Sequence, residues 1–451
     1  MDNKKDFYIN LYKIAVPIAL QSLIMAVLYL TDQLMVGQLG DVAIASVGMA
    51  SKIYSIIAVV LAGLATGVSI FAAQFWGNKD TKSISQLLGF ALMLGIVLSL
   101  LFSIIVFFYP EFCLSLFTTD TNVTENGYIF LKVVAISYVP TMLTMMYSAI
   151  LRSTGHVKFP MYVSLAVVAL NIVLNYLLIY GHFGFPEMGL EGSAYATVIS
   201  RIVECILIIG AVYKFRLPGS VEVKYLFSIS GPLVKKFFQT TYPIILTELV
   251  WVLGEAVYAI IYSRMGTIEM TAMTITFPLQ GLTIGLLSGL SGAAAVIVGN
   301  KLGAGENDSA LDYAKRFIRF GIISSVILGV IIAALSPLYV KAFNISDEAN
   351  QLSIYVIWVF AGIMWVKVAN MIIAGGILQS GGDSRFIFKL ESSTTWLIGV
   401  PLGLLLSVVW KQPVFWVYFF LSLEEVVRFV FGLVRINSRK WMKNLVDNIS
   451  A

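Results

Sequence analysis

Charged side chains are scarce in this chain. They make up 12% of its 451 residues, whereas 59% of the residues are hydrophobic. Soluble domains usually carry about 25% charged residues, so a water-soluble fold is excluded and a polytopic protein of the lipid bilayer is expected. The net charge of +5 requires no nucleic-acid partner, because most of the lysines and arginines lie in or beside one set of loops, as described below.

Cysteine and histidine are nearly absent, with two residues of each. Cys113 and Cys205 lie far apart and form no motif, so neither a disulfide nor a metal site is expected from them. His156 and His182 are expected in loops and make no metal site. The sequence also lacks the GxxxxGKS/T loop that holds nucleotide phosphates. We therefore expect no cofactor, no metal, no ATP and no enzymatic activity.

Long apolar runs are abundant instead. In lipid only helices or closed barrels satisfy the backbone polar groups, and runs of this length without alternation favour helices. Twelve runs can span a bilayer, at roughly 12–36, 44–75, 84–109, 124–150, 159–181, 190–213, 237–263, 268–298, 314–338, 350–378, 386–409 and 413–436. The first run is too long for a signal peptide. The expected fold is all-α, with twelve transmembrane helices.

Basic residues separate the loops into two sets. Of the 30 lysines and arginines, 22 lie in or beside alternate loops, against three (Arg264, Lys341 and Lys411) in the other set. By the positive-inside rule, both termini are expected in the cytoplasm.

The two halves of the chain are a repeat. Adding 226 to Pro17, Gly40, Gly63 and Gly77 gives Pro243, Gly266, Gly289 and Gly303, and further on an offset of 227 aligns ILRSTGHVKF with ILQSGGDSRF. Each half has an even number of spans, so the repeat is parallel. We expect an N-lobe at 1–216, a cytoplasmic linker loop at 217–236 and a C-lobe at 237–451. Rocking of one lobe against the other would expose the cleft between them to alternate sides of the membrane, as in secondary transporters.

One carboxylate interrupts the first span. Residues 14–40 read IAVPIALQSLIMAVLYLTDQLMVGQLG, and Asp32 lies before the end of that helix. A carboxylate within a span costs up to about 2.5–3.5 kcal/mol on insertion scales and therefore usually faces a cavity and binds something. The alternative is an aspartate that caps a kink or bonds a neighbouring helix.

The ordered motifs resemble the MATE family, the multidrug and toxic compound extrusion transporters of the MOP flippase superfamily. The matching pieces are P-x14-D-x4-G from Pro17, AQFWGNKD, ILRSTGHVKFP, NIVLNYLLIYG, IVGNKLGAGE and GILQSGGDSRF. The resemblance covers essentially the whole chain. It implies export of bulky, often cationic or amphipathic compounds, driven by inward flow of H+ or Na+ and not by ATP.

In the N-lobe, the resemblance joins Asp32 to asparagines of the fifth span. Asn171 and Asn175 are four residues apart and share one helical face. The alternative is interhelical hydrogen bonding, worth about 0.6 kcal/mol per bond. Gln21, Gln33 and Tyr138 are weaker candidates, and Gln21 and Tyr138 are expected at the substrate cavity.

In the C-lobe, the seventh span carries Glu248 and Glu255 two turns apart on one face. Trp251 and Tyr258 flank them, and such an aromatic, acidic cavity suits lipophilic cations. The alternative is that one glutamate pairs with a basic neighbour such as Lys367. In the sodium-coupled branch of the family an acid of this span falls nearer Trp251.

The tenth span departs further from that branch, which has an acid there. Residues 366–382 contain none and offer Lys367 and Asn370 instead. This departure disfavours a sodium site in the C-lobe and favours proton coupling at Asp32.

Three other polar groups are expected to be structural. Arg201 with Glu204, and Glu424 and Glu425 with Arg428, have the spacing of ion pairs on one helix. Asp383, at the cytoplasmic end of span ten, is expected in a turn or a gating salt bridge.

The sequence thus predicts a monomeric multidrug antiporter of a bacterial cell membrane. A lipid-linked precursor flippase of the same superfamily is the alternative, but it would need several deep basic residues, and only Lys367 is deep.

Overall fold

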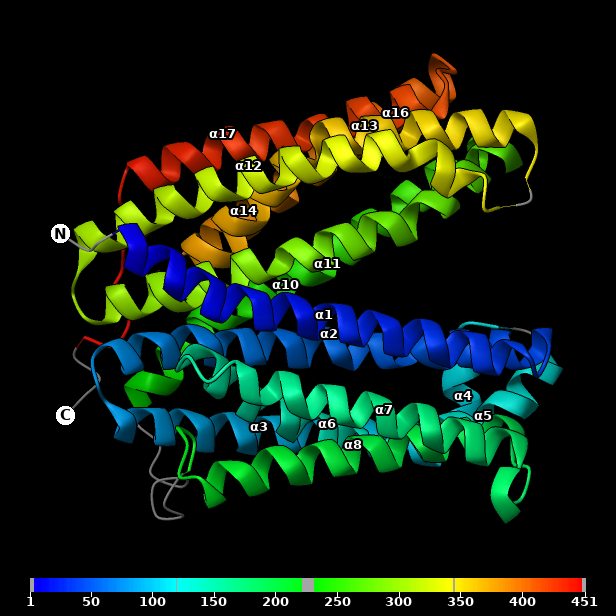
Figure 1. Cartoon of the computed structure of the whole chain (residues 1–451), viewed down its shortest axis with the longest axis horizontal. Helices are drawn as coiled ribbons and strands as arrows, with labels where there is room; N and C mark the ends of the chain where they lie inside the picture. Colours follow the sequence, from blue (N-terminus) through cyan, green and yellow to red (C-terminus); the bar gives the residue numbers. More distant parts are fainter. Residues whose placement is uncertain (1–3, 119, 221–230, 344, 448–451) are drawn as a thin grey trace. The chain divides into compact units, whose positions relative to one another are not determined.

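The computed structural model describes residues 4–118, 120–220, 231–343 and 345–447, and within these ranges the chain is helical, with no strand (Figure 1). It divides into two compact units: the N-unit, residues 20–238, and the C-unit, residues 1–19 and 239–447. Residues 4–19 therefore group with the C-unit, and not with the rest of the predicted lobe 1–216. Of the predicted linker 217–236, residues 221–230 lie outside the described residues.

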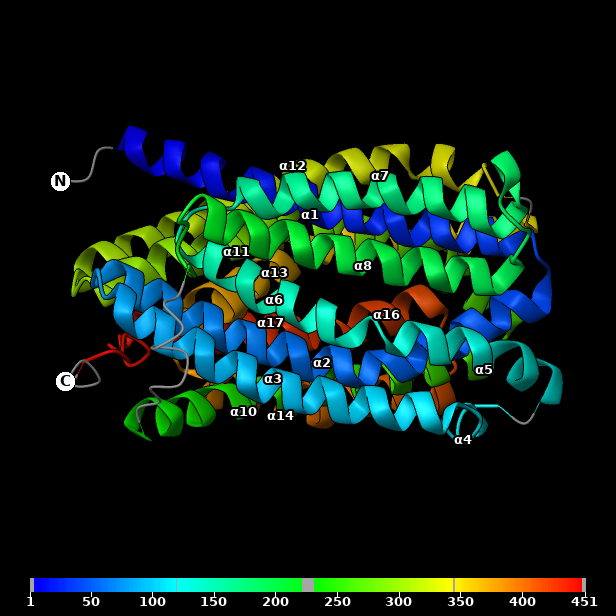
Figure 2. The same ribbon diagram turned by 90° about the horizontal axis from the view of Figure 1, so that it is seen from below.

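The N-unit is a bundle of helices that lie side by side in Figures 1 and 2. It takes the second part of α1 (Lys4–Gly37) and the start of α10 (Gly231–Met265). Between them come α2 (Asp41–Gly77), α3 (Thr81–Phe108), α4 (Pro110–Ser115), α5 (Thr121–Ala135), α6 (Tyr138–Ser153), α7 (Lys158–Tyr180), the short 3-10 turn η1 (His182–Gly184) and α8 (Gly189–Lys214).

The C-unit holds the first part of α1, the rest of α10, and the helices that follow. Three of its segments, η2, η3 and η4, are π-helical. The order is α11 (Thr267–Gly303), α12 (Asn307–Val340), α13 (Asp347–Met371), η2 (Ile372–Leu378), α14 (Ser384–Thr394), η3 (Thr395–Gly399), α15 (Val400–Leu404), η4 (Leu405–Val409), α16 (Val414–Leu421) and α17 (Leu423–Asn437).

The repeat is visible in the helix bounds. Helices α2 and α11 are each 37 residues long, and both their first and last residues are 226 apart. Helices α3 and α12 also begin 226 apart, at Thr81 and Asn307. The preceding turns match as well, since Lys79 and Gly305 both have positive φ, of 59° and 76°. The duplication therefore extends from sequence motifs to backbone conformation.

Most predicted spans are single helices. Ten are long and apolar enough to cross a membrane, and the pair α5–α6, bent by 45°, makes an eleventh among the described residues. The run predicted at 413–436 is divided between α16 and α17 at Ser422. The two pieces are 8 and 15 residues long, so neither alone has the length of a membrane span.

Each unit has an aromatic contact with a helix that it shares with the other. In the C-unit, Phe7 of α1 packs edge-on against Tyr313 and Phe317 of α12. In the N-unit, Phe237 of α10 contacts Phe71 and Phe90, with ring centroids 5.9 and 5.4 Å apart. Burial of these rings stabilises the first turns of both helices in their places.

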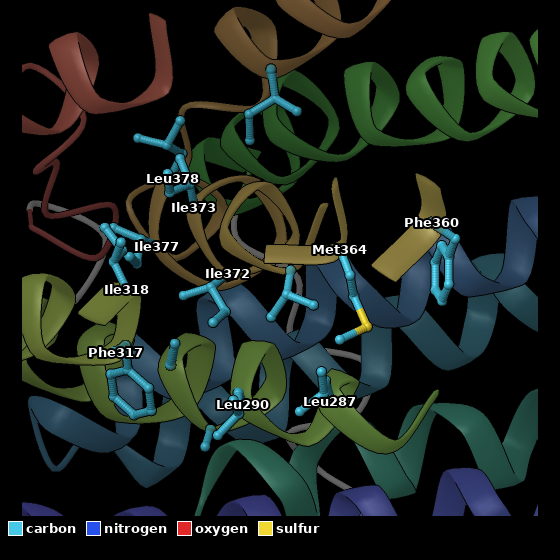
Figure 3. Close-up of a cluster of buried hydrophobic side chains, with 14 of the residues drawn as sticks. Leu287, Leu290, Phe317, Ile318, Phe360, Met364, Ile372, Ile373, Ile377 and Leu378 are labelled. Atoms are coloured by element: carbon cyan, nitrogen blue, oxygen red, sulfur yellow. The ribbon is translucent and has the colours of Figure 1, made fainter. Parts of the chain in front are cut away.

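The core of the C-unit surrounds η2 (Figure 3), where Ile372 lies against Gly321 of α12 and Ile373 against Gly432 of α17. Gly376 lets this segment approach α11, because an added Cβ would lie 2.8 Å from Ala294 Cβ. The Ser291 hydroxyl donates to the Met371 carbonyl at 2.8 Å, where the α-helix gives way to η2. Such a side-chain bond compensates a carbonyl that a change of helix type would leave unsatisfied.

Candidate functional site

Asp32 lies on α1 opposite the two asparagines of α7. Asn175 Nδ2 donates to Asp32 Oδ1 at 2.6 Å and is also 3.0 Å from Asn171 Oδ1. The two asparagines are one helical turn apart and therefore share one face of α7. Both are buried, so this is the inner face of the helix. Close by, the Tyr180 hydroxyl donates to the Met35 carbonyl at 3.0 Å and fixes α7 against this part of α1. The three polar side chains therefore form one chain of hydrogen bonds.

Asp32 also lines a cavity of about 170 Å³, which we call the N-pocket. Tyr29 and Gln33 line it from α1, Tyr54 from α2 and Arg201 from α8. Arg201 is paired with Glu204, at 2.8 Å. The N-pocket thus holds one carboxylate that no basic side chain neutralises by direct contact among the described residues.

A larger cavity, of about 480 Å³, lies in the C-unit and is called the C-pocket. Its charged lining is Glu255 of α10, Lys367 of α13, and Glu424, Glu425 and Arg428 of α17. Three carboxylates face two cations, so the charged lining is acidic by one unit.

Arg428 is the centre of the polar contacts in the C-pocket. Its guanidinium lies 3.2 Å from Glu424 and 3.4 Å from Glu425, and it donates to the Thr394 and Thr395 hydroxyls. The Tyr258 hydroxyl donates to the other oxygen of Glu424 at 2.9 Å. Almost every donor of Arg428 is therefore satisfied, as a mostly buried guanidinium requires.

Glu425 links this centre to α13. Asn370 Nδ2 donates to a carboxylate oxygen of Glu425 at 2.7 Å, and Lys367 Nζ lies 3.8 Å from the other oxygen. Lys367 therefore pairs with Glu425, and not with Glu248 or Glu255 as the alternative reading had it.

The two pockets occupy equivalent places in the repeat. Ten lining residues of the N-pocket have a partner in the lining of the C-pocket at the offset of 226 or 227. The pairs are Tyr29 and Glu255, Asp32 and Tyr258, Val36 and Tyr262, Val47 and Met273, Ser51 and Phe277, Tyr54 and Gln280, Val134 and Phe360, Thr141 and Lys367, Thr197 and Glu424, and Arg201 and Arg428.

Comparison with known proteins gives the family. The family model MatE matches residues 17–177 and 243–432, and the two matches begin at the repeat-related prolines Pro17 and Pro243. The chain belongs to the MATE family. It is therefore a transporter of the MOP superfamily and not an enzyme.

Individual relatives and structures match nearly the full length. The chain is 25% identical over 442 residues to the uncharacterized transporter YisQ of Bacillus subtilis, covering 96% of this chain and 95% of that one. It is 22% identical over 452 residues to a probable multidrug resistance protein NorM of Thermotoga maritima, covering 97% and 94%. A crystal structure of a mutant of the Vibrio cholerae MATE transporter VcmN shares the fold, with a TM-score of 0.89 at 14% identity and 98% of each chain covered.

In this MATE transporter, four residues singled out from the sequence share the C-pocket: Trp251, Glu255, Tyr258 and Lys367. Asn370 lies beside them, bonded to Glu425. Glu248, on the same helix, is half-buried and does not line this pocket.

Of the three weaker candidates, Gln33 lines the N-pocket, and Gln21 and Tyr138 lie elsewhere in the N-unit. Gln21 donates to the Ser164 hydroxyl at 3.0 Å. Tyr138 is fully buried and packs between Tyr54 and Phe102, with ring centroids 5.4 and 5.8 Å away. Neither side chain lines the N-pocket or the C-pocket.

The ion pairs expected from helical spacing are present. Arg201 pairs with Glu204, and Arg428 with Glu424. Asp383 makes the expected salt bridge, with Arg435 at 2.6 Å and Lys443 at 3.2 Å. What spacing alone missed is that Glu424, Glu425 and Arg428 also line the C-pocket of this transporter.

Proposed function

We propose that this MATE transporter is a secondary-active antiporter that exports amphipathic, often cationic small molecules in exchange for protons. The single observation that carries the proposal is the geometry of Asp32, a carboxylate within a membrane helix that accepts a 2.6 Å bond from Asn175 and lines the N-pocket. The names of the NorM relatives, probable multidrug resistance proteins, support the substrate class.

The tenth span favours H+ over Na+ as the coupling ion, because it lacks the acid of the sodium-coupled branch, and the hydrogen bonds at Asp32 suit a proton. Asn175 Oδ1 is a buried acceptor without a hydrogen-bond partner among the described residues. A protonated carboxyl gains one O–H donor, which the ionised form lacks. Protonation of Asp32 would therefore supply a donor beside an unsatisfied acceptor. No cofactor and no ATP enter this scheme.

The C-pocket favours a cationic substrate. Its charged lining is acidic by one unit, and Trp251 and Tyr258 supply aromatic faces that attract cations. This balance disfavours the alternative, a flippase for lipid-linked precursors, because a pyrophosphate needs an excess of basic residues. Lys367 and Arg428 are the two cations of this lining, and both lie beside glutamates.

The transport cycle follows from the charge of Asp32. Substrate binds while the carboxylate is ionised, and a proton from outside then neutralises it. A neutral Asp32 no longer requires water around it, so the second part of α1 repacks. Pro17 is the pivot of this movement, because a proline removes one helix hydrogen bond. Alternating access of the two repeat units completes the export. We place the protein in a bacterial cell membrane as a monomer, with both termini in the cytoplasm.

The test is gradient-driven flux in proteoliposomes loaded with a fluorescent lipophilic cation. Wild type and Asp32→Asn are compared under a pH gradient and, separately, under a Na+ gradient. Dye movement that needs the pH gradient and is lost in the variant supports the proposal. Movement driven only by Na+ would refute proton coupling and direct attention to Glu248 and Glu255. No movement under either gradient would refute the antiporter and make the flippase the next hypothesis.

A further inference from the structure

A third hollow lies in the N-unit and shares no residue with the N-pocket. It measures about 750 Å³ and is formed by the turn between α2 and α3, the turn before α7, and the segment that follows α8. These three segments come together at one end of the unit, on the left in Figure 1. We call it the corner pocket. The side chains that matter for its chemistry are Trp76, Lys82, His156, Phe215 and Arg216.

The corner pocket is basic. Lys82 and Arg216 are its basic side chains, and none of the described residues that line it carries a carboxylate. Within the described part of the chain, neither of these cations is engaged by an acidic side chain. The nearest acid in sequence, Asp80, is occupied in capping α3, where it accepts from the backbone N–H and the hydroxyl of Ser83 at 3.0 and 2.6 Å.

His156 adds a polar ring to the same wall. Its Nδ1 lies 3.3 Å from the Thr154 hydroxyl, and its ring packs edge-on against Trp76. For the other ring nitrogen, Nε2, the described residues show no hydrogen-bond partner. An imidazole N–H, an ammonium and a guanidinium are the donors that recognise phosphate.

The equivalent positions of the C-unit carry acids. Lys82 corresponds to Asp308 at the offset of 226, and His156 to Asp383 at 227. The backbone agrees, since His156 N donates to the Leu151 carbonyl as Asp383 N donates to that of Leu378. In the C-unit both acids are neutralised, Asp308 by Arg439 and Asp383 by Arg435 and Lys443.

The C-unit also fills its corner with its own chain. Trp441 is fully buried there, and its carbonyl lies against Gly381 so closely that an added Cβ would collide with it. Leu445 lies against Gly382 in the same way. One corner of the repeat is thus packed, with its acids paired to basic side chains. The other is hollow, and its two cations have no acidic partner among the residues that the structure describes.

We propose that the corner pocket binds the phosphate headgroup of an anionic phospholipid. A phosphodiester would offset one of the two positive charges of Lys82 and Arg216, and basic pockets at the ends of membrane helices are typical sites for such headgroups. The remaining wall suits a lipid more than a soluble phosphate, because Trp76 and the 61% exposed Phe215 offer apolar surface beside the cations. The occupant is thus amphipathic, with its charge at the membrane surface.

The test uses the full-length protein in detergent micelles and native mass spectrometry. The probes are dioleoylphosphatidylglycerol, zwitterionic dioleoylphosphatidylcholine and soluble glycerol 3-phosphate. The variant is Lys82→Asp, which gives the N-unit the acid of the C-unit. The matched control is Lys158→Asp, a basic residue near the same turn that is exposed and outside the pocket. Lys82→Gln replaces the variant if Lys82→Asp does not fold.

We expect phosphatidylglycerol to bind in preference to phosphatidylcholine. Its affinity should fall by about fivefold in Lys82→Gln and further in Lys82→Asp, and stay at the wild-type value in Lys158→Asp. Equal binding of the two lipids, or equal losses in Lys82→Asp and Lys158→Asp, would overturn the proposal. Binding of glycerol 3-phosphate without the lipid would also overturn it and assign the pocket to soluble phosphates.

Discussion

The two units of this transporter build the same pocket with different chemistry. Asp32 of the N-pocket and Tyr258 of the C-pocket occupy one position of the repeat, yet the first is an acid held by an amide and the second a hydroxyl donor to Glu424. Conversely, Glu255 stands where the N-unit has Tyr29. The duplication has kept the place of each side chain while the acid has moved by one helical turn.

The supporting cations differ less than the acids. Arg201 and Arg428 are repeat-related and line both pockets, but Arg201 has one carboxylate partner and Arg428 has two. A buried ion network resists a change of protonation because each charge stabilises the others. The isolated acid of the N-pocket is therefore better suited to load and release a proton, and the C-pocket to hold a fixed field for a cation.

The largest effect is expected from removing the isolated acid. Asp32→Asn should reduce export driven by a pH gradient to the level of liposomes without protein, because an amide cannot take up the proton. Tyr258→Phe, at the equivalent position, should retain export, since it loses only a donor to Glu424. Flux assays on the two variants check this, and a loss confined to Tyr258→Phe would place the coupling in the C-unit.

A large effect on stability is expected when Arg428 of the C-unit is replaced. Arg428→Met leaves Glu424 and Glu425 without their shared cation, and the loss of one partner of a buried ion pair costs about 3–5 kcal/mol. Arg201→Met should cost less, because it deprives only Glu204 and its guanidinium is more exposed. Unfolding in micelles, followed by circular dichroism, measures both, and equal losses would contradict the assigned difference between the networks.

The N-pocket was more accessible to sequence reasoning than the C-pocket. Asp32 stands out because it interrupts an apolar run, and the spacing of Asn171 and Asn175 places both on one face of α7. In the C-unit, spacing predicts the contact of Glu424 with Arg428 within α17. It gives no reason to expect Asn370 of α13 beside Glu425, because that contact depends on how two helices pack.

The fold, like the pockets, was predictable only in part from the sequence. Apolar runs and the repeat give the helices and their order, down to the matching bounds of α2 and α11. The π-helical segments η2, η3 and η4 could not be foreseen, since their residues have the composition of ordinary membrane helix and the change lies only in hydrogen bonding. The place of residues 4–19 in the C-unit likewise depends on close packing of α1 with α11.

That packing gives a prediction of intermediate size. A Cβ on Gly289 of α11 would collide with the Ala15 carbonyl and lie 3.0 Å from Ala19 Cβ. Gly289→Ala should therefore destabilise the protein by about 1–3 kcal/mol. Gly285→Ala, one turn earlier with nothing within 4 Å of the added Cβ, should instead stabilise it by up to about 1 kcal/mol. Thermal unfolding of the pair decides, and a stabilising Gly289→Ala would refute the close approach of α1.

The smallest effect on stability is expected at Lys367, which stands where the N-unit has Thr141. Its 3.8 Å contact with Glu425 is the longest in the C-pocket network, and Glu425 keeps Arg428 and Asn370 when the lysine is removed. Lys367→Met should thus change stability by less than about 1 kcal/mol.

The same substitution should have a clear effect on binding. With Lys367 gone, three carboxylates face one cation in the C-pocket lining, so the field at a bound lipophilic cation becomes more favourable. A gain of about 1 kcal/mol, or about fivefold in affinity, is expected for a cationic dye. Fluorescence titration measures it, with Thr141→Val of the N-pocket as the control that should leave affinity unchanged. Weaker dye binding in Lys367→Met would contradict this prediction. It would mean that the lysine contacts the substrate itself, and that the C-pocket does not act through its net charge.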